Sequence, residues 1–529
     1  MNKTKLYLSV VIFILGLLLR IWDFGKNPPG LYLDEASQGY NAYSLLKTGK
    51  DEYGKAWPVF FRSFGTYPSS LYGYFTTVPV YIFGLEPSVV RLTSLVFGLI
   101  LVVLITSWLG LMPGLVVAVS PVFIFMSRAA FEANIALTIV ILALILAVKA
   151  GIRHRYLPIS FAMFALSAYA YHAERLLGPL MILLTSLYYW LKQPELRKNI
   201  ISSLIFSLIV MLPIGLVTFY SGTNSRLQEL SHTGTQLEQL GQIISHYFSY
   251  FSPKNLFIKP DPDLQRSFPE LSVFHWWMIS PFIIGIFHFL KKPNNALLFL
   301  GLLSVIPGAV TKDDFSTLRV LPLFILVTLV ISRGLEKISV HKNLLLFVII
   351  FFSLIDNYSG LTLLKHERSR VWNYEYRQLS DFLLTQNKYS VIIDNSRVKP
   401  VYILLAFYSK YPPQLIQQDY PPDFLKTYYQ KTTFTSERIL GNYEIRSISW
   451  ADDVYKTQLI VGDKWAISDQ QVSEHVLHLV RSISDINGNP VLKIYLTDPE
   501  KKCLNAVKNH ELYNPLCEKF TLASTVLSF

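Results

Sequence analysis

Residues 69–85, SSLYGYFTTVPVYIFGL, decide the topology that we predict for this chain. The stretch is apolar, but it is shorter than the ~20 residues that a transmembrane helix needs, and it is rich in Tyr, Thr, Pro and Gly. If it does not cross the membrane, the basic connections 149–155, 191–198, 291–292 and 333–342 all fall on the side of the N-terminus. Positively charged connections favour the cytoplasmic side. We therefore expect residues 69–85 to form an aromatic helix that lies in or near the outer membrane plane.

The other apolar blocks predict eleven transmembrane helices, with the N-terminus in the cytoplasm and the C-terminus outside. The 529 residues are 51% hydrophobic and 16% charged, which is too apolar for one soluble domain of this length. The first block follows Lys3 and Lys5 and leads into Arg20 instead of a small-residue cleavage site, so we interpret it as an uncleaved helix and not as a signal peptide. The predicted spans lie near 5–22, 89–108, 110–127, 131–148, 156–172, 176–191, 199–219, 273–290, 295–310, 318–333 and 343–357.

The net charge and the motifs exclude several classes of function. The formal net charge is +12, but the basic residues gather between apolar blocks, which is typical of membrane proteins and not of proteins that bind nucleic acid. The sequence contains no zinc-type spacing of Cys and His, no glycine loop that would cradle phosphates, and no short internal repeat. We therefore expect a mainly α-helical, polytopic protein of the plasma (inner) membrane.

Two long connections and the C-terminal part carry the predicted extramembrane structure. The first exported loop covers about 23–88 and should hold interfacial helices, one of them near 36–47, and a second exported loop covers about 220–272. After Asp356 the charge density rises and long apolar blocks end, so residues 1–357 form the transmembrane domain and residues 358–529 a soluble extracytoplasmic α/β domain. In that domain we predict helices over 371–386 and 399–410 and strands over 390–394, 444–448 and 491–495.

The chain has two cysteines, Cys503 and Cys517, and both lie in the predicted extracytoplasmic domain. Disulfides persist outside the cytoplasm, so the two residues are candidates for one disulfide. The alternative is a pair of reduced, buried thiols.

Acidic and basic side chains gather at the outer ends of the predicted spans. They occur in four separate connections, as Asp34 and Glu35, Arg128 and Glu132, His172 and Arg175, and Lys312 and Arg319. Taken singly, each is an ordinary helix-end charge. Ionisable residues near a bilayer are costly, however, and mark function when they face a cavity. The cytoplasmic connections contain mainly Lys and Arg. The occurrence of both acidic and basic side chains on the extracytoplasmic side therefore indicates a functional site there.

The chemistry that fits this combination is transfer from a lipid-linked phosphate donor. Asp34 is the first candidate for the general base that takes a proton from an acceptor hydroxyl, and Glu35 is a candidate orienter of the acceptor or a structural partner. Basic side chains at the same depth would hold the phosphate and stabilise its charge as it leaves. The candidates for this role are Arg128, His172, Arg175, Lys312 and Arg319; for His172, Arg175 and Arg319 the alternative is interfacial anchoring.

Glu132 is the second acidic candidate, and two interpretations of it stay open. It lies four residues after Arg128, so the two can form a local ion pair on one helical face. Alternatively, Glu132 faces Asp34 across a cavity and binds the acceptor or a divalent metal, for which the sequence offers no ligand geometry. Further candidates for acceptor or loop contacts are Tyr67, Asp261 and Arg266, with interfacial anchoring as the alternative for Tyr67.

Several short motifs carry a family resemblance through their order and spacing. They are Asp34-Glu35-Ala36 with Gly39-Tyr40-Asn41-Ala42, Gly49-Lys50-Asp51-Glu52-Tyr53-Gly54, Tyr67-Pro68-Ser69-Ser70-Leu71-Tyr72-Gly73-Tyr74, Arg91-Leu92-Thr93-Ser94, Ser120-Pro121 and Leu318-Arg319. In this order they resemble bacterial membrane glycosyltransferases of the protein-mannosyltransferase-like, family 39 type, which have the GT-C fold. The resemblance covers about the first 340 residues.

The resemblance implies a polyprenyl-phosphate-linked sugar as donor, an extracytoplasmic active site and inversion at the sugar. It places the family's catalytic carboxylate at Asp34 and its second acidic position at Glu132. Lys259-Pro260 stand where the family has glycine before the aspartate, which weakens any role carried onto Asp261. The tail after residue 358 has no match, so the acceptor hydroxyl stays open between protein, cell-envelope glycan and lipid.

Two other functions remain open from the sequence. A transporter or flippase for lipid-linked sugars would show inverted repeats and charges near the membrane midplane, whereas the charges here lie at one rim. A non-catalytic envelope scaffold would tolerate replacement of the acidic pair without loss of any glycan.

Overall fold

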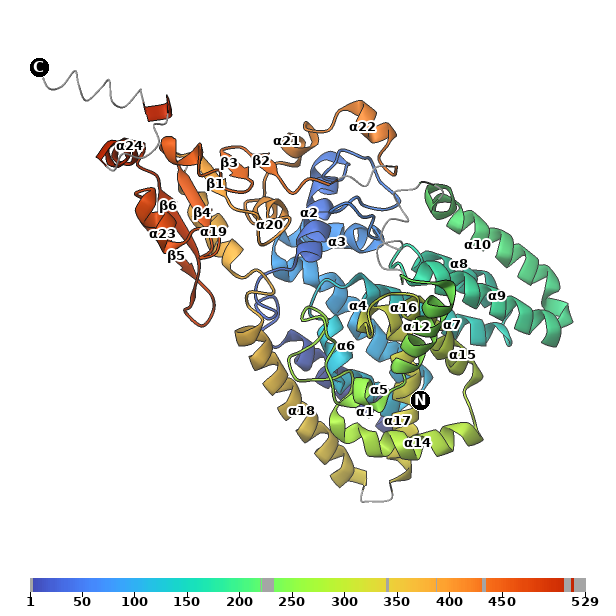
Figure 1. Cartoon of the computed structure of the whole chain (residues 1–529). Coiled ribbons are helices and arrows are strands. Elements are labelled where there is room, and N and C mark those ends of the chain that lie inside the picture. Colours follow the sequence, from blue (N-terminus) through green and yellow to red (C-terminus); the bar gives the residue numbers. More distant parts are fainter. Residues whose placement is uncertain are drawn as a thin grey trace, which may run out of the picture.

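The computed structural model describes residues 3–218, 220, 233–338, 342–386, 388–430, 434–508 and 515–517. It has two parts, a large helical body and a smaller C-terminal domain built on a β-sheet (Figure 1). Parts of the second long loop, of the basic connection 333–342 and of the C-terminal tail, over 221–232, 339–341 and 518–529, lie outside the described residues. The protein is therefore a mainly helical, multi-span membrane protein with a C-terminal mixed-sheet domain.

Each of the eleven predicted spans corresponds to one helix or to two successive helices. In the part of the chain that the structure describes, six helices are long and apolar enough to cross a membrane, and three further apolar helices are shorter. The helices of the body are α1 (Lys3–Ile21), α2 (Leu33–Thr48), α3 (Leu71–Phe83), α4 (Pro87–Trp108), α5 (Leu111–Val119), α6 (Pro121–Met126), α7 (Glu132–Ala150), α8 (Tyr156–Ser167), α9 (Glu174–Lys192), α10 (Arg197–Thr218), α12 (Gln236–Ser249), α13 (Pro253–Phe257), α14 (Ile279–Lys291), α15 (Asn295–Ser304), α16 (Ile306–Ala309), α17 (Leu321–Lys337) and α18 (Lys342–Glu367).

Helix α3 occupies the stretch on which the predicted topology depends. It has 13 residues, so at 1.5 Å per residue it is about 20 Å long, against ~30 Å for the hydrocarbon core of a bilayer. Val78, Tyr81, Ile82 and Phe83 are exposed near its C-terminal end, an apolar face that suits contact with lipid. The length and this face agree with a helix that does not cross the membrane by itself.

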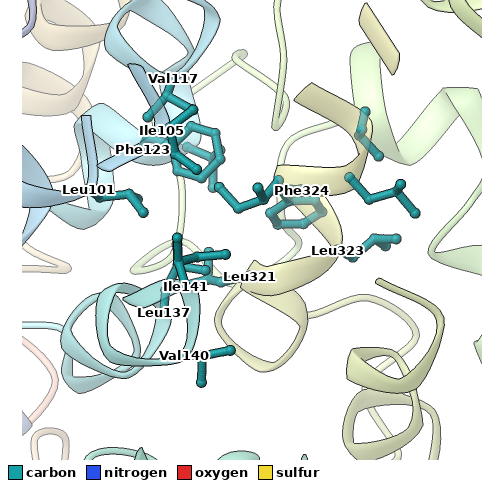
Figure 2. Close-up of a cluster of buried hydrophobic side chains, with 14 of the residues drawn as sticks. Leu101, Ile105, Val117, Phe123, Leu137, Val140, Ile141, Leu321, Leu323 and Phe324 are labelled. Carbon is teal, nitrogen blue, oxygen red and sulfur yellow. The ribbon is translucent and has the colours of Figure 1, made fainter. Parts of the chain in front are cut away.

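The core of the helical body is built from α4, α5, α6, α7 and α17. Figure 2 shows Leu101 and Ile105 of α4, Val117 of α5 and Phe123 of α6 next to side chains of α7 and α17. Helices α7 and α17 are apolar around their whole circumference and mostly buried, as expected for central helices. In contrast, α10 and α18 are equally apolar but mostly exposed, which marks them as lipid-facing.

The C-terminal domain contains one six-stranded sheet with strand order β2-β3-β1-β4-β6-β5. The central strands β3, β1 and β4 are parallel, and β2, β6 and β5 add antiparallel neighbours. The elements are α19 (Glu375–Leu383), β1 (Val391–Ile393), α20 (Tyr402–Tyr408), α21 (Pro413–Gln417), α22 (Pro422–Lys426), β2 (Arg438–Leu440), β3 (Tyr443–Ile445), β4 (Leu459–Gly462), α23 (Asp469–Glu474), β5 (His478–Ser484), β6 (Pro490–Leu496) and α24 (Pro499–Lys508). The predicted strands and helices of this domain are all present, although each helix is shorter than predicted.

The two parts share a hydrophobic core, although the sequence suggests two separate domains. One buried cluster joins Tyr40 and Val90 of the helical body to Leu404 and Phe407 of α20. Gly39 lies at this crossing, where a Cβ atom would come within 2.6 Å of side-chain atoms of both Phe407 and Val90. The C-terminal domain therefore packs directly on α2, the helix that carries Asp34 in its first turn.

Two further features concern the boundary and the tail. Helix α18 continues to Glu367, ten residues beyond the predicted end of the last span at 357, because its amphipathic end extends past the apolar block. Cys503 of α24 and Cys517 are joined in a disulfide, the pairing that the sequence predicts.

Candidate active site

A cavity of about 610 Å³ opens between the helical body and its long loops. Seven of the predicted site residues line it: Asp34, Tyr67, Glu132, His172, Arg175, Arg266 and Arg319. They come from six stretches of the sequence, which supports the prediction that these stretches converge. The cavity wall also includes apolar residues such as Ile214, Pro307, Val310 and Leu318.

The two acidic candidates occupy equivalent positions at the starts of two helices. Asp34 lies in the first turn of α2 and Glu132 is the first residue of α7, where the helix dipole favours a negative charge. The residues before these helices stack on each other, with the rings of Tyr32 and Phe131 5.6 Å apart. Tyr32 also donates a hydrogen bond to the carbonyl of Ala130 (3.3 Å). These contacts bring the N-terminal ends of α2 and α7 side by side at one wall of the cavity.

Gln38 links the two acidic positions. It lies one helical turn after Asp34, so both side chains share a face of α2. Its amide nitrogen donates to the carboxylate of Glu132 and to the carbonyl of Ser69 (3.1 Å). This contact orients Glu132 toward α2, and it replaces the local ion pair with Arg128 that the sequence left open.

Glu35, unlike its neighbour Asp34, does not line the cavity. Its carboxylate forms a bidentate ion pair with Arg91 at 2.9 and 2.8 Å, and both side chains are fully buried. One oxygen also accepts a hydrogen bond from the backbone N–H of Ala130 (2.6 Å). The structure therefore argues against contact between Glu35 and a substrate, and it favours the alternative of a structural partner that fixes α2 against α4 and the turn before α7.

Arg128 does not line the cavity, and the structure argues against its predicted contact with phosphate. Its guanidinium is fully buried and donates to the backbone carbonyls of Leu19, Arg20, Trp22 and Asn27 at 2.6–3.3 Å. These carbonyls lie at and just beyond the C-terminal end of α1, where a helix leaves its last carbonyls without intrahelical partners. Arg128 therefore caps α1.

Arg175 and Tyr67 form one wall of the cavity. The Arg175 guanidinium lies 3.8 Å from the centre of the Phe60 ring, and it donates to Ser69 Oγ at 3.3 Å and to the carbonyl of Tyr67 at 3.4 Å. Tyr67 in turn donates through its hydroxyl to the carbonyl of Tyr428 in the C-terminal domain. The C-terminal domain thus helps to position this wall.

A second group of charged residues lies around Asp313, and its two arginines, Arg266 and Arg319, line the cavity. One carboxylate oxygen of Asp313 accepts from both Arg266 (3.1 Å) and Arg319 (2.8 Å), and Arg266 also pairs with Asp263 at 3.0 Å. Burial alone would raise the pKa of Asp313, but Arg319 and Arg266 outweigh it and hold the pKa below its ordinary value. Asp313 is therefore ionised near neutral pH.

Two other predicted residues lie outside the cavity wall. Lys312 is exposed and does not line the cavity. Asp261 is buried, and its carboxylate accepts from the backbone N–H of Thr317 (2.7 Å), the Thr317 hydroxyl (2.9 Å) and the backbone N–H of Asp263 (2.9 Å). Asp261 therefore ties the second long loop to the start of α17, and it shapes the site without facing it.

The sequence analysis did not select Gln38, Arg91 or Asp313 as site residues. Gln38 follows Asp34 by one helical turn, and that spacing was a usable signal. Arg91 and Asp313 had no such local signal. Arg91 is 56 residues from its partner Glu35, and Asp313 is 47 residues from its partner Arg266. Among the described residues, no group of three or more His, Cys, Asp and Glu side chains is placed to hold a metal ion, so a metal between Asp34 and Glu132 stays a prediction.

The sequence matches no protein-family model and no curated protein. Solved structures do match the whole chain. It is similar to ArnT from Cupriavidus metallidurans in the apo state (TM-score 0.53, 10% identity, 92% of this chain and 97% of that chain). The similarity to the same protein bound to undecaprenyl phosphate has a TM-score of 0.55 at 10% identity and covers 93% and 98%. The chain therefore has the GT-C-like fold of ArnT over nearly its whole length.

Proposed function

We propose that this protein is an integral membrane glycosyltransferase that moves a sugar from a polyprenyl-phosphate-linked donor to an acceptor hydroxyl on the extracytoplasmic face. The observation that carries the proposal is the composition of one cavity, which holds the acids Asp34 and Glu132 together with Arg175, Arg266 and Arg319. A phosphate leaving group and a hydroxyl nucleophile need these two kinds of group. The shared fold with ArnT, which is known bound to undecaprenyl phosphate, supports a lipid-linked donor.

In the proposed reaction Asp34 is the general base. The acceptor hydroxyl oxygen attacks the anomeric carbon of the sugar, while the carboxylate of Asp34 takes the hydroxyl proton. The bond between the anomeric carbon and the phosphate oxygen breaks, and its electron pair stays on the phosphate. The product lipid is a polyprenyl phosphate. Attack opposite the leaving group inverts the anomeric configuration.

The arginines of the cavity would neutralise the charge that develops on the phosphate. Arg266 and Arg319 lie together, since both contact Asp313, and Arg175 and His172 also line the cavity. Guanidinium groups suit a phosphate because their planar N–H groups match its oxygens, and stabilisation of the leaving group lowers the barrier most in a site that excludes water. Tyr67, which is apolar in body and polar at its tip, would border the sugar.

Glu132 would bind a hydroxyl of the acceptor or of the sugar. Gln38 and the first turn of α7 hold its carboxylate at the cavity wall, and an ionised carboxylate accepts hydrogen bonds from sugar hydroxyls strongly. If a divalent metal takes part, the carboxylates of Asp34 and Glu132, which lie at the starts of α2 and α7, would hold it. The metal would supply charge stabilisation for the phosphate.

The test compares variants in the source organism. Deletion of the gene should remove one sugar from an envelope glycan, lipid or glycoprotein, and mass spectrometry of these fractions names the sugar and the acceptor together. Wild-type protein should restore the sugar, and Asp34→Asn should not, although it should reach the membrane in normal amount. Asp423→Asn is the matched control, because that carboxylate is exposed in the C-terminal domain. Full restoration by Asp34→Asn would overturn the assignment of the base.

A further inference from the structure

Asp313 occupies the position between two arginines where an anion would bind. The NH1 atoms of Arg266 and Arg319 both contact its Oδ2 atom, at 3.1 and 2.8 Å. The arginines come from different segments, Arg266 from the second long loop and Arg319 from the turn before α17. Both arginines line the cavity, whereas Asp313 does not. A single oxygen that bridges two guanidinium groups resembles one oxygen of a bound phosphate.

The carboxylates of this cluster already compensate the charge of its arginines. Arg266 and Arg319 pair with Asp263 and Asp313, and Asp261 is a third carboxylate that interacts electrostatically with Arg266. A phosphate that joined the cluster without any change would meet a carboxylate of like charge at short range, which is unfavourable in a partly buried site. The arginines can bind a phosphate fully only when one carboxylate leaves.

We propose that Asp313 is an internal counter-ion that holds Arg266 and Arg319 until the phosphate of a lipid-linked substrate replaces it. The return of Asp313 to the two arginines then helps to release the polyprenyl phosphate product. This proposal rests on the proposed function. It makes Asp313 a positioning residue that competes with phosphate, since it contacts the arginines and not the reacting atoms.

The surroundings of Asp313 allow its side chain to move while the arginines stay in place. The side chain is 33% exposed, so it can turn toward solvent. The following residue is fixed, because the carbonyl of Asp314 accepts from Ser249 Oγ at 2.8 Å. The backbone N–H of Ser316 donates to the Tyr250 hydroxyl at 3.2 Å. These two contacts hold the backbone of residues 314–316 against Ser249, the last residue of α12, and against Tyr250, which follows it.

Each arginine keeps a partner when Asp313 leaves. Arg319 donates to the hydroxyl of Thr311 at 2.6 Å. Arg266 donates to Ser316 Oγ at 3.0 Å and stays paired with Asp263 at 3.0 Å. The two guanidinium groups are thus held close together by side chains other than Asp313, and they are ready for an incoming phosphate.

The charge of the phosphate changes during the reaction. The competition between Asp313 and the phosphate for the two arginines therefore matters most for release of the product. The sugar-linked donor is a phosphodiester with one negative charge, whereas the polyprenyl phosphate product is a monoester with about 1.5 to 2 negative charges near neutral pH. The same two arginines therefore hold the product more strongly than the donor. A carboxylate that competes for the arginines lowers the affinity for both lipids and speeds the release of the product.

The experiment measures undecaprenyl phosphate binding to the purified full chain in detergent, together with turnover once the donor is known. Asp313→Asn should bind undecaprenyl phosphate about tenfold or more tightly than the wild type, because the fraction of protein with free arginines rises. Its turnover should fall, with a burst of product in the first cycle. The neighbouring variant Asp314→Asn, at a side chain that is 90% exposed, is the control and should bind as the wild type does.

Three other outcomes are informative. Unchanged or weaker binding by a folded Asp313→Asn protein would show that Asp313 only supports the arginines, and it would overturn the inference. Arg319→Gln should weaken binding in either case. If the wild type does not bind undecaprenyl phosphate, or if Arg319→Gln and Arg266→Gln bind as the wild type does, the proposed donor site itself fails, and the inference fails with it.

Discussion

Asp34 and Glu35 are neighbours in the sequence but have opposite surroundings. Successive side chains on a helix point about 100° apart, so α2 presents Asp34 to the cavity and Glu35 to Arg91 in the core. We propose that the first carboxylate takes part in chemistry and that the second one fixes the helix that carries it. The two roles make different predictions for substitution.

At the scale of single residues we predict that Glu35→Gln lowers stability much more than Asp34→Asn. Removal of one partner from a buried ion pair leaves the other charge uncompensated, which costs about 3–5 kcal/mol. Asp34 is exposed at the cavity, so its substitution should leave unfolding nearly unchanged. Thermal unfolding of both variants in detergent measures the difference. A stable Glu35→Gln protein that has lost transfer activity would contradict this view and would indicate a direct role for Glu35.

At the scale of elements, the turn after α22 connects the C-terminal domain to the cavity wall. The Tyr428 hydroxyl donates to Asp51 and accepts from the backbone N–H of Arg62 (2.7 Å). The Tyr428 carbonyl accepts from Arg62 NH1 at 3.1 Å and from the hydroxyl of Tyr67. Tyr67 is itself part of the cavity wall. One residue of the C-terminal domain therefore organises the first long loop.

We predict that Tyr428→Phe destabilises the protein by about 1–3 kcal/mol, because it leaves the buried Asp51 carboxyl and the Arg62 N–H without this hydroxyl. Transfer activity should fall less than stability, because the Tyr428 carbonyl that accepts from Tyr67 is still present in the variant. Tyr358→Phe is the matched control, because that ring lies on α18 and is 62% exposed. The unfolding temperatures of the two variants in the same detergent provide the comparison. Equal unfolding temperatures would show that the hydroxyl of Tyr428 is dispensable.

The same interface should make stability depend on pH. Burial raises the pKa of Asp51 from 3.8 to about 6 and that of Glu52 from 4.5 to about 7. Between about pH 4 and pH 7 the folded protein therefore binds more protons than the unfolded chain. Stability should fall as the pH rises through this range, by up to ~1.4 kcal/mol per pH unit for each group.

Substitution of Glu52 tests this pH dependence. Glu52→Gln keeps the hydrogen-bonding geometry toward Tyr402 (3.0 Å) and Asn41 (3.3 Å), but it removes one titrating group. We expect the variant to lose less stability between pH 5 and pH 8 than the wild type, as measured by unfolding temperature. Glu474→Gln, at an exposed position, should keep the slope of the wild type. A slope that is equal in all three proteins would exclude Glu52 as a contributor to the pH dependence.

At the scale of the whole molecule, the proposed orientation places the cavity and the C-terminal domain outside. The prediction depends on α3, which is too short to cross the membrane by itself. Single cysteines at Lys50 and Lys312 should react with an impermeant thiol reagent added to intact cells, and a cysteine at Lys192 should react only after permeabilisation. All three positions are exposed, and both native cysteines are joined in a disulfide, so the background is low. The reverse labelling pattern would invert the topology.

The sequence by itself determined the helices, the mixed α/β nature of the C-terminal domain and seven of the residues that line the cavity, and it predicts that α3 does not cross the membrane. Hydrophobic blocks and turns can be recognised from neighbouring residues alone. A charged residue at the end of an apolar block must lie near the membrane surface. For this reason Asp34, Glu132, Arg175 and Arg319 were predicted near one depth, and the structure brings all four to one cavity.

Only the tertiary structure decided which of these charges face the cavity. Arg128 and Arg319 both lie at helix ends, yet Arg128 is surrounded by carbonyls of α1 and its flanking turn, while Arg319 meets Asp313 at the cavity wall. Glu35 finds Arg91 in the core, and the C-terminal domain reaches Tyr67 through Tyr428. Glu35 and Arg91 are 56 residues apart in the sequence, Arg20 and Arg128 are 108 apart, and Tyr67 and Tyr428 are 361 apart. Such long-range pairings depend on how the helices pack, and no local pattern encodes them.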